Sequence, residues 1–345
     1  MKIKRDDLQG ALEKVKPGLA DKEIIEQATY FAFMGEKVVT YNAELSISHP
    51  VPGLEDFTGA IKAEELYKFL TKTSAESIEI ELGGEFIRLK AGKATVKFAL
   101  QKEVKLPLEE VEKIGKWKPI PKEFLSALKE IIFSCSKDMS RPLLTCANIL
   151  NDGTIESSDN FRATRYQIDK MPVGSFLLPA TSAQELVKYE VTEICTGKEK
   201  DFSWVHFRTG DGTIISCIVW ADEYPNIVNK MLEDKGKKNK IQFPDTVPAI
   251  LERAAIFAKR EQRTDEFVEV RVDNRKLTIS AKSAFGQFEE WVKVEYAGEP
   301  FLFSLNPTLL SDMLKVAKEC KVSPTRIIME GKNWSHVCIL EEERV

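Results

Sequence analysis

The residues best suited to recognition chemistry lie in segment 156–166, which reads Glu-Ser-Ser-Asp-Asn-Phe-Arg-Ala-Thr-Arg-Tyr. Asp159 and Asn160 predict a tight turn, because Asn tolerates positive φ and Asp can hydrogen-bond its own backbone. The turn joins two predicted strands and leaves Phe161 and Arg162 at a rigid corner. An apolar ring beside a planar cation fits two structures: a hairpin corner with a solvated Arg, or the wall of a groove that binds a peptide.

The other chemically capable side chains favour structural roles. The cysteines are dispersed, lack a Cys-x-x-Cys pair and have apolar or strand-like neighbours, which predicts buried free thiols. They are Cys135, Cys146, Cys195, Cys217, Cys320 and Cys338. His49, His206 and His336 lie far apart in sequence, so neither a metal site nor a Cys/His nucleophile is indicated. Gly83-Gly84 predicts a hairpin turn rather than a phosphate loop. We therefore expect no catalytic residue, no metal and no cofactor.

The composition is that of a soluble globular protein. Of 345 residues 30% are charged and 43% hydrophobic, and this length allows two or three domains. The net charge of −4 gives no domain-wide basic field, although an acidic chain can bind DNA if its Lys and Arg gather on one face. The basic start, residues 1–5, is followed by two Asp instead of an apolar core, and no apolar run approaches about 20 residues. We expect a soluble, cytoplasmic protein without a membrane partner.

Apolar periodicity predicts a weak internal repeat in which a helix precedes a run of strands. The predicted helices cover residues 5–15, 63–73, 121–133, 181–190 (with Ser182 as N-cap), 246–259 and 307–320. The predicted strands cover 27–33, 37–41, 44–48, 58–61, 77–82, 86–90, 94–100, 147–150, 154–157, 163–168, 176–179, 193–196, 202–208, 213–220, 268–272, 276–281, 287–296, 301–304, 326–330 and 335–340. Charged segments at 104–117 and 233–240 are typical of linkers. We expect an α+β fold of three similar domains, 1–113, 114–232 and 233–345, each with two helices packed on antiparallel sheet.

Lysines recur on or beside the predicted helices. They are Lys14, Lys62, Lys68, Lys72, Lys122, Lys129, Lys188, Lys315 and Lys318. One interpretation is an ordinary solvated helix face, since Glu is nearly as common on the same segments. The other is a concave surface that follows a phosphate backbone without contacting bases. The repeats favour the second interpretation, because repeated domains can build a ring whose inner wall consists of helices.

Four motifs, in the same order along the chain, point to one family. Residues 159–163, Asp-Asn-Phe-Arg-Ala, are similar to its Asp-Gly-His-Arg-Leu corner, and 140–144, Ser-Arg-Pro-Leu-Leu, to an Arg-Pro-x-Leu strand beside that corner. Residues 223–228 are similar to a Phe-Pro-Asp-Tyr segment, and 277–300 to a third-domain core. Over essentially its full length the chain resembles the β sliding clamp of bacterial replicative DNA polymerases.

The resemblance implies a processivity factor in DNA replication. Its head-to-tail homodimer of six clamp domains would encircle double-stranded DNA without sequence preference and tether the DNA polymerase. Val96 and Phe98, on an edge strand of domain one, would meet Ile256 and Phe257, on the first helix of domain three. Two cations at matching positions are the candidates for phosphate contacts: Arg141 and Lys188.

The resemblance also implies a groove between domains two and three for peptides of polymerases and of the clamp loader. The residues that map onto it are Leu144, Ser158, Asn160, Phe161, Arg162, Ala163, Met231, Leu232, Val337, Ile339 and Leu340. Phe161 replaces a His of the family, and Asn160 replaces a Gly. The end of the sequence, 341–345, is Glu-Glu-Glu-Arg-Val where the family has Met-Pro-Met-Arg-Leu, which should disfavour acidic peptides.

Two other classes of protein stay open. A clamp-fold adaptor would bind replication or repair proteins without encircling DNA, and failure to close a ring would identify it. An enzyme is disfavoured, because no His, Cys or Ser constellation accompanies the plentiful carboxylates. The third repeat disfavours two-domain clamps that trimerise, and the departures from the motifs fit a remote member of cellular or phage origin.

Overall fold

The structure is a computed structural model that describes residues 1–54, 57–197, 203–220, 222–233, 236, 239–260 and 266–340. The acidic segment 341–345, Phe202, and residues 234–235 and 237–238 of the second predicted linker lie outside them. Two compact units make up the chain: Met1–Leu125 with Lys170–Asp222, and Ser126–Asp169 with Glu223–Val345. No helix in the described part of the chain is long and apolar enough to cross a membrane.

The first unit contains two antiparallel sheets. Its helices are α1 (Arg5–Val15), the 3₁₀ helix η1 (Lys16–Gly18), α2 (Ala63–Lys72) and α4 (Ala180–Leu186). Its strands are β1 (Lys2–Lys4), β2 (Tyr30–Met34), β3 (Lys37–Tyr41), β4 (Leu45–Pro50), β5 (Thr58–Lys62), β6 (Ser77–Leu82), β7 (Phe86–Ala91), β8 (Ala94–Ala99), β9 (Lys118–Pro119), β13 (Phe176–Pro179), β14 (Val191–Thr196), β15 (Trp204–Thr209) and β16 (Ile214–Ile218). The sheet orders are β5-β2-β3-β4-β16-β15-β14-β9 and β1-β6-β7-β8, so β8 is an edge strand.

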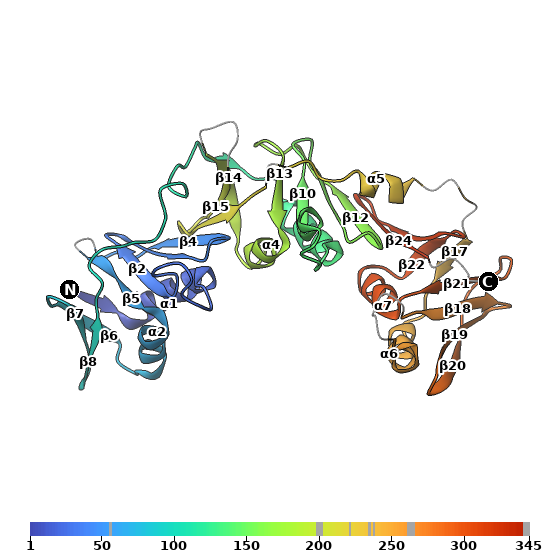
Figure 1. The fold of residues 1–345 in the computed structure, drawn as a ribbon, viewed down its shortest axis with the longest axis horizontal. Helices are drawn as coiled ribbons and strands as arrows, with labels where there is room; N and C mark the ends of the chain where they lie inside the picture. Colours follow the sequence, from blue (N-terminus) through green and yellow to red (C-terminus); the bar gives the residue numbers. More distant parts are fainter. Residues whose placement is uncertain are drawn as a thin grey trace. The chain divides into compact units, whose positions relative to one another are not determined.

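The second unit repeats this plan. Its helices are η2 (Ile132–Ser134), η3 (Pro142–Thr145), α5 (Ile227–Leu232), α6 (Val247–Ala258) and α7 (Pro307–Val316), while α3 (Phe124–Ile131) crosses the unit boundary. Its strands are β10 (Cys146–Ile149), β11 (Thr154–Ser158), β12 (Arg162–Gln167), β17 (Asn239–Gln242), β18 (Val268–Asp273), β19 (Lys276–Ser283), β20 (Gly286–Lys293), β21 (Phe301–Leu305), β22 (Glu319–Val322), β23 (Arg326–Glu330) and β24 (Trp334–Ile339). They lie in the orders β10-β11-β12-β24-β23-β22-β17 and β20-β19-β18-β21, with α6 against β19 and β20 (Figure 1).

One motif, a strand and a helix followed by three strands, occurs six times in the described chain. The first copy is β1-α1-β2-β3-β4 and the last is β21-α7-β22-β23-β24, while α5 lies between the fourth and fifth copies. The helices are amphipathic: α2, for example, buries Ala63, Leu66 and Leu70 and exposes Glu64. The α+β class with paired helices and antiparallel sheets is therefore confirmed. The division at residues 113 and 232 stays a prediction.

Several predicted helix boundaries are wrong. The helix predicted over 121–133 begins at Phe124, whose N–H bonds the Pro121 carbonyl in a preceding turn. Ser182 lies inside α4 rather than at its N-cap, which is Pro179 and has no side-chain cap. The helix predicted to reach 320 ends at Val316, because Cys320 already belongs to β22 and faces the core. The short helix α5 was not predicted.

Two other segments also differ from the prediction. The strand predicted over 27–33 begins at Tyr30, because Gln27 adopts φ 64° in the turn that precedes it. The strand predicted around Pro142 is the 3₁₀ helix η3, since proline fixes φ near the helical value and lacks an N–H for a ladder. The segment predicted as the first linker contributes Leu106 and Leu108 to a buried cluster over β2 and β3.

Candidate functional site

The corner between β11 and β12 has the local geometry that its sequence predicts. Asn160 adopts φ 74°, and Asp159 Oδ1 accepts hydrogen bonds from the N–H groups of Phe161 (3.0 Å) and Arg162 (2.9 Å). Ser158 Oγ accepts a third bond, from the Asn160 N–H (3.1 Å). The Asx turn thus satisfies the corner's amide donors within the corner itself and fixes the direction in which its two functional side chains leave the backbone.

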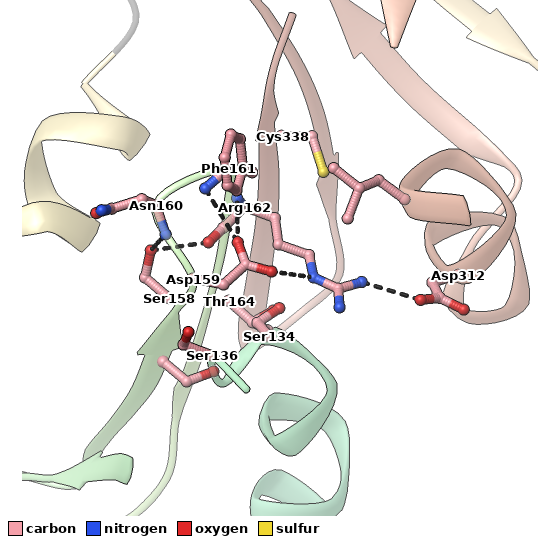
Figure 2. Close-up of polar contacts among 12 residues, drawn as sticks. Ser134, Ser136, Ser158, Asp159, Asn160, Phe161, Arg162, Thr164, Asp312 and Cys338 are labelled. Carbon is pink, nitrogen blue, oxygen red and sulfur yellow. Dashed lines mark hydrogen bonds and ion pairs between the residues drawn. The ribbon is translucent and has the colours of Figure 1, made fainter. Parts of the chain in front are cut away.

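Arg162 is not a solvated cation. It is only 9% exposed, its Nε donates to Asp159 Oδ2 (3.1 Å), and its Nη1 donates to Asp312 Oδ2 on α7 (3.0 Å). Figure 2 shows the guanidinium extending from the corner toward α7. Burial opposes ionisation of Asp312, but hydrogen bonds from Lys315 and Arg162 outweigh it and lower the pKa of that carboxyl. The Arg162 side chain therefore fastens the corner to α7.

Phe161 is the exposed member of the corner. Its ring is 47% exposed, while its carbonyl accepts the N–H of Ile339 (2.9 Å). Behind it β12 and β24 pair in antiparallel register, with Ala163 opposite Val337. This pairing brings together predicted site residues that lie far apart in sequence, and it presents a large apolar ring to solvent from a rigid support.

The α5 region packs on the other side of the corner. The Ser158 N–H donates to the Tyr224 hydroxyl (2.9 Å), and Ser158 Oγ contacts Met231 Sδ (3.5 Å). Burial raises the pKa of Tyr224, so this hydroxyl stays protonated at ordinary pH. Of the other predicted groove residues, Leu144 is buried on η3, Leu232 is half-buried, and Leu340 lies in the core of the unit. 

Sequence reasoning missed Tyr224 and Asp312 as members of this site. Tyr224 lies within the motif 223–228, so that motif was the available signal for it. Asp312 gave no signal, because 150 residues separate it from Arg162.

A corner at the same position in the motif recurs at two other places, with the same turn geometry in the first repeat and a different one in the third. In unit one, Asn42 Oδ1 accepts the N–H of Leu45 (2.9 Å), and Ala43 adopts the same φ as Asn160, 74°. In unit two, Ser283 Oγ accepts the N–H of Phe285 (3.2 Å) between β19 and β20. Each corner precedes the last strand of the first motif in a pair, namely β4, β12 or β20.

The strands that leave these corners differ in what they pair with. The strand β4 pairs with β16, and Ile218 donates its N–H to the Glu44 carbonyl (2.9 Å). The strand β12 pairs with β24, and Ile339 bonds Phe161 in the same way. The strand β20 is an edge, as is β8, the last strand of the second motif. Both therefore keep a free hydrogen-bonding side within the sheets of the described chain.

The residues predicted to close a dimer lie on the edge strand β8 and on the helix α6, which packs against β20. Val96 and Phe98 are half-buried on β8, with the Phe98 ring edge-on to Phe69 (centroids 6.1 Å apart). Ile256 is 63% exposed on α6, and beside it Phe257 is half-buried against β20. Ile256 is thus an exposed apolar side chain on a helix whose other exposed residues include Glu252 and Arg253.

The residues predicted to contact phosphates are one exposed cation and one ion-paired cation. Arg141 is exposed at the start of η3, and Lys188 donates to Glu185 (2.7 Å). Other predicted helix lysines also pair with carboxylates: Lys14 with Asp211, Lys62 with Glu23, Lys68 with Glu64, Lys315 with Asp312, and Lys318 with Asp245. Exposed ion pairs of this kind contribute little to stability, about 0–1 kcal/mol.

The described cysteines, together with His206 and His336, are buried groups, which disfavours a nucleophilic or metal-binding role for them. All six cysteines are buried and free, as predicted, and burial raises the pKa of Cys135 to about 12. Burial lowers the pKa of His206 to about 4 and of His336 to about 3, and each ring bonds a buried hydroxyl. No group of three or more potential metal ligands occurs among the described residues.

Six strand–helix–strand motifs, taken in successive pairs, define the DNA-clamp class of fold. The particular fold is that of the bacterial DNA polymerase III β subunit. The chain is similar to the β chain from Streptococcus pneumoniae (TM-score 0.84, 15% identity) and the β subunit from Pseudomonas aeruginosa (0.83, 16%), each over 99% of both chains. It is also similar to the sliding clamp from Bacillus subtilis (0.81, 17%), over 99% of this chain and 98% of that one. Neither the models of protein families nor the curated proteins contain a match. The predicted clamp fold is thus confirmed.

Proposed function

We propose that this protein is a DNA sliding clamp: a head-to-tail homodimer that encircles duplex DNA and tethers a polymerase for processive synthesis. The observation that supports it most directly is the pair of free strand edges, β8 and β20. The six motifs form three successive pairs, and each junction within the chain joins the strand that ends the first motif of one pair to the strand that ends the second motif of the next pair. In this way β4 joins β16, and β12 joins β24. The two strands left over are one of each kind, so β20 of one copy can join β8 of the next.

The contact is heterologous, and such a contact gives a ring where the rotation between copies closes and an open filament where it does not. In the proposed ring, two such junctions join two copies. The apolar side chains of Val96, Phe98, Ile256 and Phe257 then supply the buried centre that a stable contact needs. The three-domain division, 1–113, 114–232 and 233–345, makes this a six-domain ring.

The same proposal explains why the helix cations need not be strong DNA ligands. A ring holds DNA by topology, so weak and salt-sensitive phosphate contacts suffice and leave sliding unimpeded. Arg141 and Lys188 are the proposed contacts, and they recognise the backbone rather than the sequence. The role requires no catalysis and no cofactor, and it places the protein with the DNA in the cytoplasm.

The β11–β12 corner is the proposed docking site for polymerase and clamp-loader peptides. The half-exposed Phe161 ring offers an apolar anchor, and Ile339, which bonds the Phe161 carbonyl, is its neighbour in the proposed groove; Met231 and Leu144, both buried, are the other proposed apolar members. The Asp159 and Asp312 carboxylates neutralise Arg162, so its part is to hold the corner rather than to bind an acidic ligand.

The mass of the protein in solution, measured by sedimentation over a dilution series, tests ring closure. We expect twice the mass of the chain and, after loading, retention on nicked circular DNA with loss when the circle is cut. Phe98→Lys with Ile256→Lys should give monomers, because the contact would bury unpaired charges. A monomer at every concentration would favour the clamp-fold adaptor, which binds the same partners without encircling DNA.

A further inference from the structure

Each repeat has a sheet face that points away from its helices. Thr40 and Ser157 donate to carbonyls at the ends of α1 and α3, so the next residues, Tyr41 and Ser158, point to the opposite face. Each of these two residues immediately precedes its corner. Lys282 holds the same position before the third corner, which identifies the corresponding face of β18, β19 and β20.

In the first repeat a segment of the chain covers this face. Leu106 and Leu108, which follow β8, pack with Ala32, Val39 and Tyr41 in one buried cluster. Tyr41 is consequently only 9% exposed. The covering segment, residues 104–111, reads Val-Lys-Leu-Pro-Leu-Glu-Glu-Val, so it combines apolar side chains with two carboxylates.

In the second repeat the segment after β16 covers the face in the same manner. Tyr224 and Met231 contact Ser158, and Asn229 accepts a hydrogen bond from Arg165 (2.6 Å). Ser158 is fully buried as a result. The corresponding face of two repeats is therefore covered by a following segment of the chain, which is non-helical in the first repeat and contains the helix α5 in the second.

In the third repeat none of the described residues covers this face. Its outward side chains line a hollow of about 1510 Å³, which lies between the end of α6 and the β19–β20 hairpin. They are Phe267, Glu269, Ser280, Lys282, Gln287 and Glu289. Phe267 is 42% exposed, and Phe285 at the corner is 99% exposed. With Trp291 and Leu302, this one sheet and its corner carry four of the eleven large apolar side chains that are exposed in the described chain.

Cations gather beside the two exposed phenylalanines. Arg260 donates to the Lys282 carbonyl (2.6 Å) and lies over the Phe267 ring, 5.9 Å from its centroid. Lys259 and Lys282 line the same hollow. No described carboxylate forms an ion pair with any of these three cations. Because the lining carries three cations against two carboxylates, Glu269 and Glu289, the favoured ligand for this end of the face combines an apolar side chain with an acidic group.

We propose that the outward face of β18, β19 and β20 is a second peptide-binding site, which takes an extended apolar and acidic segment of another protein. The in-chain segment 104–111 shows the chemistry that the corresponding face accepts, since its Leu residues are buried while Glu109 and Glu110 stay exposed, Glu110 in an ion pair with Lys113. Phe267 and Phe285 receive the apolar side chains, and Lys282 with Lys259 receives the carboxylates. The site is separate from the β11–β12 corner and does not require that the ring close.

A fluorescent nonapeptide with the sequence of residues 104–112, Val-Lys-Leu-Pro-Leu-Glu-Glu-Val-Glu, is the probe. Titrated with the full-length protein and followed by anisotropy, it should bind saturably. Phe267→Ala with Phe285→Ala should weaken binding at least tenfold. Lys282→Glu, as a separate variant, should also weaken binding, and its difference from wild type should grow as the salt concentration is lowered. Both rings are exposed, so these variants should keep the wild-type melting temperature. Phe161→Ala, at the corresponding corner of the second repeat, is the matched control and should bind as wild type does.

Hydrogen exchange locates the peptide independently. We expect protection of amides in β18–β20 and none at 158–163. Loss of binding only in Phe161→Ala would place the peptide at the other corner and overturn the proposal, as would equal binding by all variants or no binding at all. If the Phe267→Ala and Phe285→Ala changes instead lower the sedimenting mass and leave peptide affinity unchanged, the face belongs to the contact between copies, which also overturns it.

Discussion

Replacing Gln287 and Lys97 by cysteine should join two copies of this chain through disulfides at the proposed closing junction. The register follows from the corners. In both in-chain junctions the second strand residue after the corner faces a fixed partner: Ser46 lies opposite Ser216, and Ala163 lies opposite Val337. Gln287 holds the corresponding position on β20, because Gly286 closes the third corner as Arg162 closes the second.

The partner position on β8 comes from the hairpin that precedes it. A two-residue turn joins Gly331 to Trp334 before β24, and another joins Ala91 to Ala94 before β8. Val337 is the third residue after Trp334, and Lys97 is the third after Ala94. In both in-chain junctions the corresponding residues form a hydrogen-bonded pair, for which Cα atoms lie about 5.5 Å apart. Disulfides span Cα separations of about 4.4–6.8 Å, so the engineered cysteines are within reach.

Thr95→Cys provides the matched control. Thr95 points to the same side of β8 as Lys97 but lies two residues along, which shifts its Cα by about 6.8 Å and places it about 8.7 Å from Gln287. That separation exceeds the roughly 7 Å limit for a disulfide. The native cysteines do not interfere, since all six are buried.

Mild oxidation followed by non-reducing electrophoresis is the assay. The Gln287→Cys, Lys97→Cys variant should give one covalent species of two chains, whereas single variants and the Thr95→Cys pairing should remain monomers in denaturant. A ladder of larger multimers would mean that the contact forms but does not close. Cross-linking by the Thr95→Cys pairing instead of Lys97→Cys would refute the register, and no cross-link in either would refute the junction.

Three further predictions concern the second unit. Asp312→Asn should lower the free energy of unfolding, measured in urea, by about 1–3 kcal/mol, because the buried Arg162 guanidinium loses a charged partner. Asp245→Asn, which removes an exposed pair, is the control and should lower it by less than about 1 kcal/mol. Equal effects would contradict the conclusion that Arg162 fastens the corner to α7. Burial lowers the pKa of His336 to about 3 in the folded chain, against about 6.5 in the unfolded chain. The contribution of this residue to the free energy of unfolding is therefore complete above pH 6.5 and falls by about 1.4 kcal/mol per pH unit toward pH 3. Urea unfolding of His336→Gln should depend less steeply on pH over this range, and an unchanged slope would contradict the prediction. Phe161→Ala should leave the mass and melting temperature unchanged but reduce clamp-dependent polymerase stimulation at least tenfold, and full stimulation would remove this corner from the docking site.

The parts of the site that sequence could predict are those with local causes. The turn at Asp159 and Asn160 needs only its own side chain and a tolerated positive φ, and both are present in the structure. The distant partner of Arg162 could not be predicted, because Asp312 lies on a helix 150 residues away in sequence. Leu340 was assigned to the groove by the family resemblance; in the structure it packs in the core of the unit, and its part in a groove stays a prediction.

The segment 104–117 shows a second limit. Its charges and prolines are typical of a linker, yet Leu106, Leu108 and Val111 are buried against the first sheet. Only the position of that sheet decides whether such side chains find a surface, so composition could not separate a tether from a packed segment. The six-motif pattern was easier to predict, because helix and strand periodicities persist over many residues and survive errors at each boundary.

The three junctions differ in a way that bears on how a ring of this chain would behave. In the two in-chain junctions, the peptide chain itself holds the paired strands near each other, and a covering segment adds buried apolar area. Among the described residues, the proposed junction of β20 with β8 has neither aid, so its population should depend on protein concentration and on the apolar contact of Ile256 and Phe98. It is therefore the junction expected to open first, and Phe285, at the corner from which β20 begins, is the exposed phenylalanine nearest to that strand in sequence. A segment bound to that face would be well placed to report or control the opening, which ring-opening rates measured with and without the nonapeptide would reveal.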